Sequence, residues 1–89
     1  MTVCKHVFYS GRVQGVGFRY TALNVAEDYE VAGFVRNLPN GTVEVFAEGS
    51  PEQVDTFLSA LAQRMAGYID QTRVVDEPAS GAKGFRVRY

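Results

Sequence analysis

The chain has 89 residues, of which 46% are hydrophobic, and its formal net charge is −1 at pH 7. This length predicts one domain over residues 1–89, and the single cysteine and single histidine exclude an internal disulfide and a metal site of several Cys and His ligands. No apolar run is long enough to cross a membrane or to serve as a signal peptide, so we expect a cytoplasmic protein without a membrane partner.

The first half of the chain predicts a strand, a helix and a hairpin. Apolar and polar residues alternate over residues 3–13, which are also rich in β-branched and aromatic types; this is typical of a strand. Apolar residues then recur at helical spacing, which predicts a helix over residues 18–30. Residues 31–38 and 42–48 are typical of two strands. Asn40-Gly41 between them favours a hairpin turn, because this pair tolerates a positive φ.

The strongest helix signals follow the hairpin. Ser50 is the expected N-cap, Pro51 takes the first helical position, and Gln53 completes a capping box. The apolar residues that follow at helical spacing predict one buried stripe: Val54, Phe57, Leu58, Leu61 and Met65. Gly67 is placed to end this helix in a left-handed conformation.

The rest of the chain predicts two more strands, over residues 69–76 and 84–89. The order is therefore β-α-β-β-α-β plus a C-terminal strand. We expect an α+β fold, a ferredoxin-like α/β sandwich with two helices packed on one face of a mostly antiparallel five-stranded sheet.

The turn between the first strand and the first helix is the main candidate site. Residues 14–19 offer successive backbone N–H groups with no proline among them, and Gly15 and Gly17 allow the turn to curl these groups inward around an anion. Arg19 lies in the first helical turn, where a cation is unfavourable unless an anion is bound there. The competing interpretation is a tight strand-to-helix turn with no ligand.

Other polar residues carry weaker signals. Arg36-Asn37 lies near the end of a predicted strand, and propensity alone favours a surface arginine and a strand-ending asparagine that leads into the turn over a functional pair. We expect His6 to be a packed or surface residue and Cys4 to be unactivated. Glu44 and Glu48 alternate with apolar residues, which predicts solvent-facing positions on a strand.

Two separated segments resemble the signatures of the acylphosphatase family. Gly11–Tyr20 (GRVQGVGFRY) is similar to the family's signature loop. Gly33–Leu38 (GFVRNL), followed by Asn40–Val45 (NGTVEV), is similar to its second signature. The aromatic-rich segment Phe85–Tyr89 also fits, so the resemblance spans nearly the whole chain.

The resemblance implies hydrolysis of the carboxyl–phosphate bond of acyl phosphates, which releases a carboxylate and inorganic phosphate without a metal or cofactor. It assigns phosphate binding to Arg19 and places Asn37 as the residue that positions water. It implies that the backbone of the loop holds the phosphate through Gln14, Gly15, Val16, Gly17 and Phe18. We expect a monomer whose partners are this substrate and phosphate, not nucleic acid.

Two other classes stay open at this point. RNA-recognition domains share the element order, and Phe8 and Phe46 stand on strands that could carry stacking aromatics. A pI near 5.7 argues against them, because a basic face is expected of such modules. The other alternative is a non-catalytic binding module for a small anionic ligand.

Overall fold

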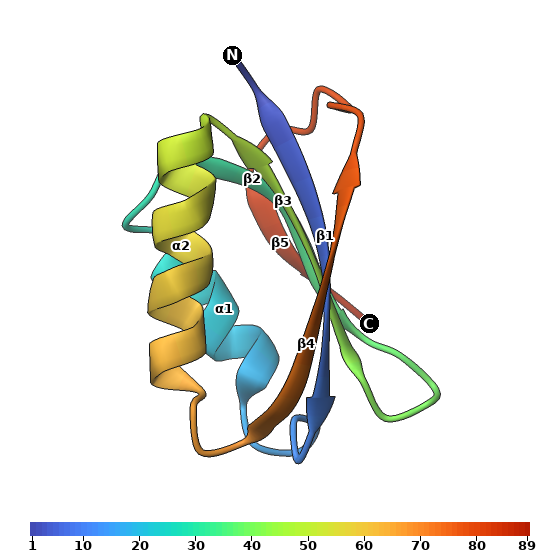
Figure 1. Cartoon of the computed structure of the whole chain (residues 1–89). Helices are drawn as coiled ribbons and strands as arrows, with labels where there is room; N and C mark the ends of the chain where they lie inside the picture. Colours follow the sequence, from blue (N-terminus) through green and yellow to red (C-terminus); the bar gives the residue numbers. More distant parts are fainter.

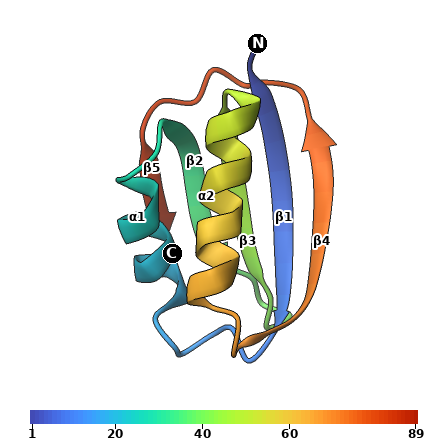
Figure 2. The same cartoon turned by 60° about the vertical axis from the view of Figure 1, so that its left-hand side comes forward.

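The computed structural model describes residues 1–89 and contains five strands and two helices. In chain order these are β1 (Val3–Gly11), α1 (Phe18–Ala26), β2 (Val31–Asn37), β3 (Val43–Gly49), α2 (Pro51–Arg64), β4 (Ile69–Glu77) and β5 (Phe85–Arg88). The sheet order is β4-β1-β3-β2-β5, with β2 and β5 parallel and every other pair antiparallel. Both helices cover the same face (Figures 1 and 2), so the expected ferredoxin-like sandwich is confirmed.

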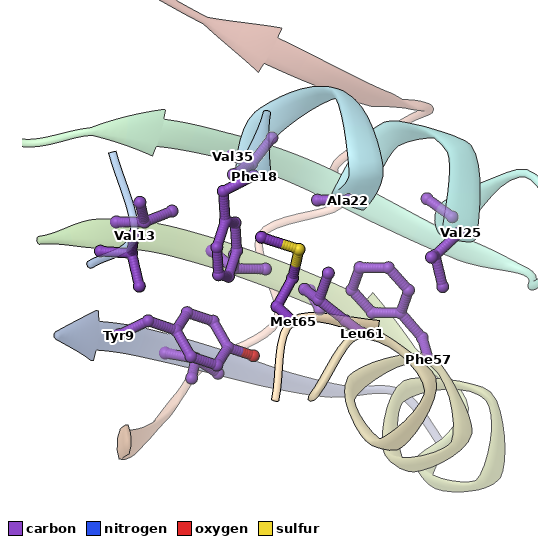
Figure 3. Close-up of a cluster of buried hydrophobic side chains, with 14 of the residues drawn as sticks. Tyr9, Val13, Phe18, Ala22, Val25, Val35, Phe57, Leu61 and Met65 are labelled. Carbon is purple, nitrogen blue, oxygen red and sulfur yellow. The ribbon is translucent and has the colours of Figure 1, made fainter. Parts of the chain in front are cut away.

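The hydrophobic core lies between the helices and one face of the sheet (Figure 3). Strand residues that alternate toward this face meet the apolar stripe expected on α2, of which Val54, Phe57 and Leu61 are fully buried. Burying a side chain of the size of Phe57 or Leu61 contributes about 1.5–3 kcal/mol each. The core therefore fixes α2 against the sheet, as the spacing of these residues predicts.

Both ends of α2 differ in detail from the expectation. Ser50 caps the helix, since its Oγ accepts from the N–H of Gln53 at 3.2 Å. The capping box is only half formed, because the Gln53 side-chain oxygen accepts from the N–H of Glu30 at 2.8 Å instead. At the other end Met65 is the C-cap and Gly67 has no positive φ, so a left-handed glycine cap was wrong. The buried Met65 side chain fixes this end by packing into the core.

The first strand and the first helix are both shorter than predicted. β1 ends at Gly11, where the pairing with β4 shifts register and the N–H of Arg12 turns to the carbonyl oxygen of Tyr68. α1 ends at Ala26, and the next three residues form tight turns in place of helix. The hairpin after β2 is confirmed, with a positive φ at Gly41 and the Asn40 side chain accepting from Thr42.

The helix-free face of the sheet corrects the expectation for Glu44 and Glu48. Each is only 5% exposed, although both alternate away from the core. Glu44 lies between Arg36 and His6, at 2.7 Å from a nitrogen of each. The segment after β4 covers Glu48, whose carboxylate accepts from both N–H and Oγ of Ser80 and from the N–H of Gly81. Strand alternation identifies the face of a residue but not what folds over it.

Gly33 allows a matched test of the sheet. It lies within β2 at φ +143°, and a Cβ there would stand 1.7 Å from the carbonyl oxygen of Phe46. Gly33→Ala should destabilise the protein by about 3 kcal/mol or more, because the backbone of β3 cannot move away from the added Cβ without breaking hydrogen bonds between β2 and β3. Gly67→Ala, with no atom within 4 Å of the added Cβ, should be neutral or slightly stabilising. Urea unfolding of both variants measures the difference, and equal stabilities would contradict it.

Glu48 predicts a pH-dependent contribution to stability. Hydrogen bonds from Ser80 and Gly81 lower the pKa of its carboxyl below the ordinary value of 4.5. The ionised form is thus favoured in the folded state, and this stabilisation is present above pH 4.5 and lost as the pH falls through the lower folded pKa. Glu48→Gln should therefore lower the Tm at pH 7, with a difference from wild type that shrinks in acid. Glu27→Gln, at an exposed position, serves as the control. If the Tm difference between Glu48→Gln and wild type did not change with pH, the assignment would be contradicted.

Candidate active site

The sheet topology brings two distant segments to one edge. β1 and β2 are both antiparallel to β3, so they run in the same direction and end at the same edge of the sheet. Figure 1 shows the loop after β1 and the loop after β2 together at the lower end of the molecule. Only β3 separates the two strands, which places their ends about 10 Å apart. Arg19 and Asn37 are thereby brought into one region.

The loop between β1 and α1, residues 12–17, is held by buried side chains at both ends. Val13 is 1% exposed and Phe18 is 2% exposed, and both belong to the core (Figure 3). Between them Gly15 and Gly17 have φ values of +76° and +79°. These are left-handed conformations that residues with a Cβ rarely adopt, which explains glycine at both positions.

The loop and the start of α1 leave a run of backbone donors free. None of the N–H groups of residues 14–19 donates to an acceptor in the protein, and the first such bond of α1 is from Thr21 to Gly17. The N-cap, Gly17, makes no side-chain cap and no acid lies in the first turn. Free N–H groups at a helix N-terminus favour the binding of an anion such as phosphate.

A hollow of about 140 Å³ joins the predicted site residues. Its lining includes Arg19, Asn37 and three of the five predicted loop positions, Gly15, Gly17 and Phe18; Val13 and Tyr20 complete it. The other two predicted loop positions, Gln14 and Val16, do not line it: the Val16 side chain packs against the core and the Gln14 side chain donates to the hairpin after β2. The prediction for both concerns their backbone N–H groups, which have no acceptor in the protein. A wider hollow of about 540 Å³, lined by Tyr89 and the 36–39 segment, adjoins it at Asn37.

Arg88 and Tyr89, at the end of the chain, hold the Arg19 side chain in place. No sequence pattern indicated this contact. The Arg19 guanidinium lies 4.8 Å from the centre of the Tyr89 ring, and its Nη1 donates a long hydrogen bond of 3.4 Å to the carbonyl oxygen of Arg88. The hydroxyls of Tyr20 and Tyr89 are hydrogen-bonded to each other, which raises the pKa of Tyr89. The parallel pairing of β5 with β2 and the packing of α1 against β5 bring these residues together.

The remaining chemically reactive side chains lie outside the hollow. Cys4 is buried on β1, and burial together with Glu48 and Glu77 raises the pKa of its thiol to about 11. His6 is packed between Glu44 and Glu77 on the helix-free face. No group of three or more His, Cys, Asp and Glu side chains is arranged to hold a metal ion. Neither helix is long and apolar enough to span a membrane.

Fold and site together define a small ferredoxin-like α/β sandwich, in which a glycine-rich loop at one edge of the sheet leads into a helix without a side-chain cap. The model of the acylphosphatase family matches residues 5–87 of this chain. An acylphosphatase of Methanospirillum hungatei is 42% identical over 81 residues, which cover 89% of each chain. One of Thermococcus kodakarensis is 41% identical over 83 residues, covering 92% of this chain and 91% of its own.

A solved structure agrees with the sequence relatives. The crystal structure of acylphosphatase from Bacillus subtilis superposes with a TM-score of 0.88 at 29% identity and covers 100% of both chains. The chain therefore belongs to the acylphosphatase family. The names of its relatives over most of its length support an acylphosphatase hydrolase, as the resemblance in the sequence implied.

Proposed function

We propose that this protein hydrolyses acyl phosphates to a carboxylate and inorganic phosphate, with Arg19 and the loop backbone binding the phosphate and Asn37 positioning the attacking water. The observation that most directly supports this is that Arg19, Asn37 and the glycines of the loop line the same hollow. Its volume of about 140 Å³ equals the liquid volume of roughly four to five water molecules, which suits a group the size of phosphate.

Phosphate binding in this proposal combines one side chain with backbone. Arg19 can form two parallel hydrogen bonds to the phosphate oxygens through its planar fork. The free N–H groups of residues 14–19 add donors that are already fixed before substrate arrives. In phosphoryl transfer most of the catalysis comes from such positioning and charge stabilisation, since little covalent help is needed.

Asn37 is proposed to orient the nucleophile. It is the last residue of β2 and lies on the wall of the hollow. The neighbouring hydrogen bonds join Gln14 to the backbone of Leu38 and Thr42 and do not involve the Asn37 side chain. Its side-chain oxygen can accept from a water and hold it in line with the phosphorus. An amide cannot remove a proton at neutral pH, so the water proton passes to a phosphate oxygen of the substrate.

The leaving group explains why no general acid is required. Cleavage of the phosphorus–oxygen bond releases a carboxylate, which is a weak base and departs without being protonated first. Water supplies the new oxygen on phosphorus, so the products are the carboxylate and inorganic phosphate. We propose that the chain acts as one domain over residues 1–89 and as a cytoplasmic monomer, without a metal, a cofactor or a nucleic-acid partner.

Benzoyl phosphate in the presence of EDTA tests the activity directly. We expect release of benzoate and phosphate in equal amounts, at a rate that does not change when EDTA is added. No hydrolysis above the spontaneous rate would contradict the proposed activity and favour a non-catalytic binding module. Loss of activity on chelation, restored by a divalent cation, would contradict the metal-free mechanism alone.

Variants of the two proposed side chains should separate binding from turnover. Arg19→Ala should lower kcat/KM by about 1000-fold and abolish inhibition by phosphate, because the main anion ligand is lost. Arg19→Lys should recover little of this, since lysine lacks the planar fork. Asn37→Ala should lower kcat by about 100-fold while the inhibition constant of phosphate stays nearly the same. If Asn37→Ala keeps most of its kcat, the role in positioning water is wrong.

A further inference from the structure

The side chain of Gln14 joins the loop of residues 12–17, the anion-binding loop of the proposed function, to the hairpin after β2. Its Nε2 group donates to the carbonyl oxygens of Leu38 at 2.8 Å and of Thr42 at 2.9 Å. Leu38 directly follows Asn37, and Thr42 directly precedes Val43, the cross-strand partner of Asn37. One amide therefore holds both sides of the hairpin loop, next to the residue proposed to orient water.

The chemistry of this contact requires a side chain with two donors. An amide NH₂ group has two hydrogens, and each points to one carbonyl oxygen. A glutamate of the same length would face both carbonyl oxygens with acceptors only, and methionine would offer no donor at all. The contact is also half-buried, so water replaces the lost hydrogen bonds only in part.

The hairpin does not need Gln14 to form. Its loop is closed by its own backbone, since the N–H of Leu38 donates to Thr42 at 2.9 Å and the N–H of Gly41 donates to Leu38 at 3.1 Å. The bonds from Gln14 are additional and come from another segment. They fix where the hairpin lies relative to the anion-binding loop, not whether it folds.

The anion-binding loop is likewise anchored independently of this side chain. Val13 and Phe18 are buried on either side of it, and the N–H of Arg12 donates to the carbonyl oxygen of Tyr68 at 2.9 Å. Arg19 is held by Arg88 and Tyr89. Without the Gln14 amide, the loop and the hairpin each keep their form, and the connection between them is what loosens.

We propose that Gln14 is a positioning residue, which acts through Asn37 by holding its strand end at a fixed distance from the bound phosphate. The inference rests on the proposed function, because it concerns the same reaction. In-line attack tolerates little displacement of the nucleophile, and a shift of about 1 Å can cost two orders of magnitude in rate.

The first test is the split between turnover and phosphate binding. Gln14→Met and Gln14→Glu keep the length of the side chain and should each lower kcat by about tenfold or more. The inhibition constant of inorganic phosphate should change by less than about twofold, because the loop and Arg19 remain in place. Loss of phosphate affinity equal to the loss of kcat would overturn the inference, since it would mean that the loop itself had collapsed.

Gln53 provides a matched control. Its side-chain amide also connects two segments, as its oxygen accepts from the N–H of Glu30, but at the start of α2 and away from the hollow. Gln53→Met should lower the Tm and leave kcat with benzoyl phosphate unchanged. If Gln53→Met lowers kcat as much as Gln14→Met, the effect is one of general stability and the inference is wrong.

A double-mutant cycle with Asn37→Ala is decisive. If Gln14 acts through Asn37, adding Gln14→Met to Asn37→Ala should lower kcat by less than about twofold. An additive loss of tenfold or more would show that Gln14 acts on its own and would overturn the inference while the proposed function stands. No hydrolysis by the unmodified protein would overturn both. Slow solvent exchange of the Gln14 NH₂ protons, measured by NMR, checks the two hydrogen bonds without reference to activity.

Discussion

The burial of Val13 and Phe18 on either side of residues 14–17 is the constraint on which the candidate site depends. A loop whose glycines adopt left-handed conformations and whose N–H groups have no acceptor in the protein is unfavourable by itself, since conformational freedom is lost without a backbone hydrogen bond gained within the protein. The two apolar side chains, 1% and 2% exposed, offset this by packing into the core. The donors can thus point outward in a fixed arrangement before any anion arrives, which is the condition under which they stabilise charge most effectively.

Strand pairing then determines which distant groups meet the loop. Because β1 and β2 share β3 as a neighbour, the loop and Asn37 lie at one edge of the sheet. Because β5 is parallel to β2, Arg88 and Tyr89 reach the same edge and contact Arg19. Strand pairing therefore brings together three segments that are far apart in the sequence: two of them line the hollow, and the third holds Arg19. The Gln14 amide adds side-chain hydrogen bonds between two of them.

The features that the sequence predicted are those governed by nearby residues. The apolar spacing of Val54, Phe57 and Leu61 was sufficient to predict α2 and its buried face, and Gly15 and Gly17 indicated the loop. The errors involve partners from elsewhere in the chain. Gln53 bonds to Glu30 in place of its own helix cap, Met65 fixes the helix end expected at Gly67, and Glu48 is covered by Ser80. The contact of Tyr89 with Arg19 belongs to the same class, because no local pattern encodes which strand lies beside β2.

The small number of reactive side chains near the hollow is consistent with the reaction we propose. Cys4 and His6 lie on the helix-free face of the sheet and do not line the hollow. The Cys4 thiol is buried and its pKa is raised to about 11, and His6 is packed against Glu44, so neither is available to the hollow as a nucleophile or base. A substrate that already carries a good leaving group and its own phosphate oxygens needs neither. What it does need is a fixed distance between the bound phosphate and the incoming water. In the mechanism we propose, that distance depends on how two independently anchored segments are joined, so a rigid connection between the loop after β1 and the hairpin after β2 would contribute more than further catalytic groups.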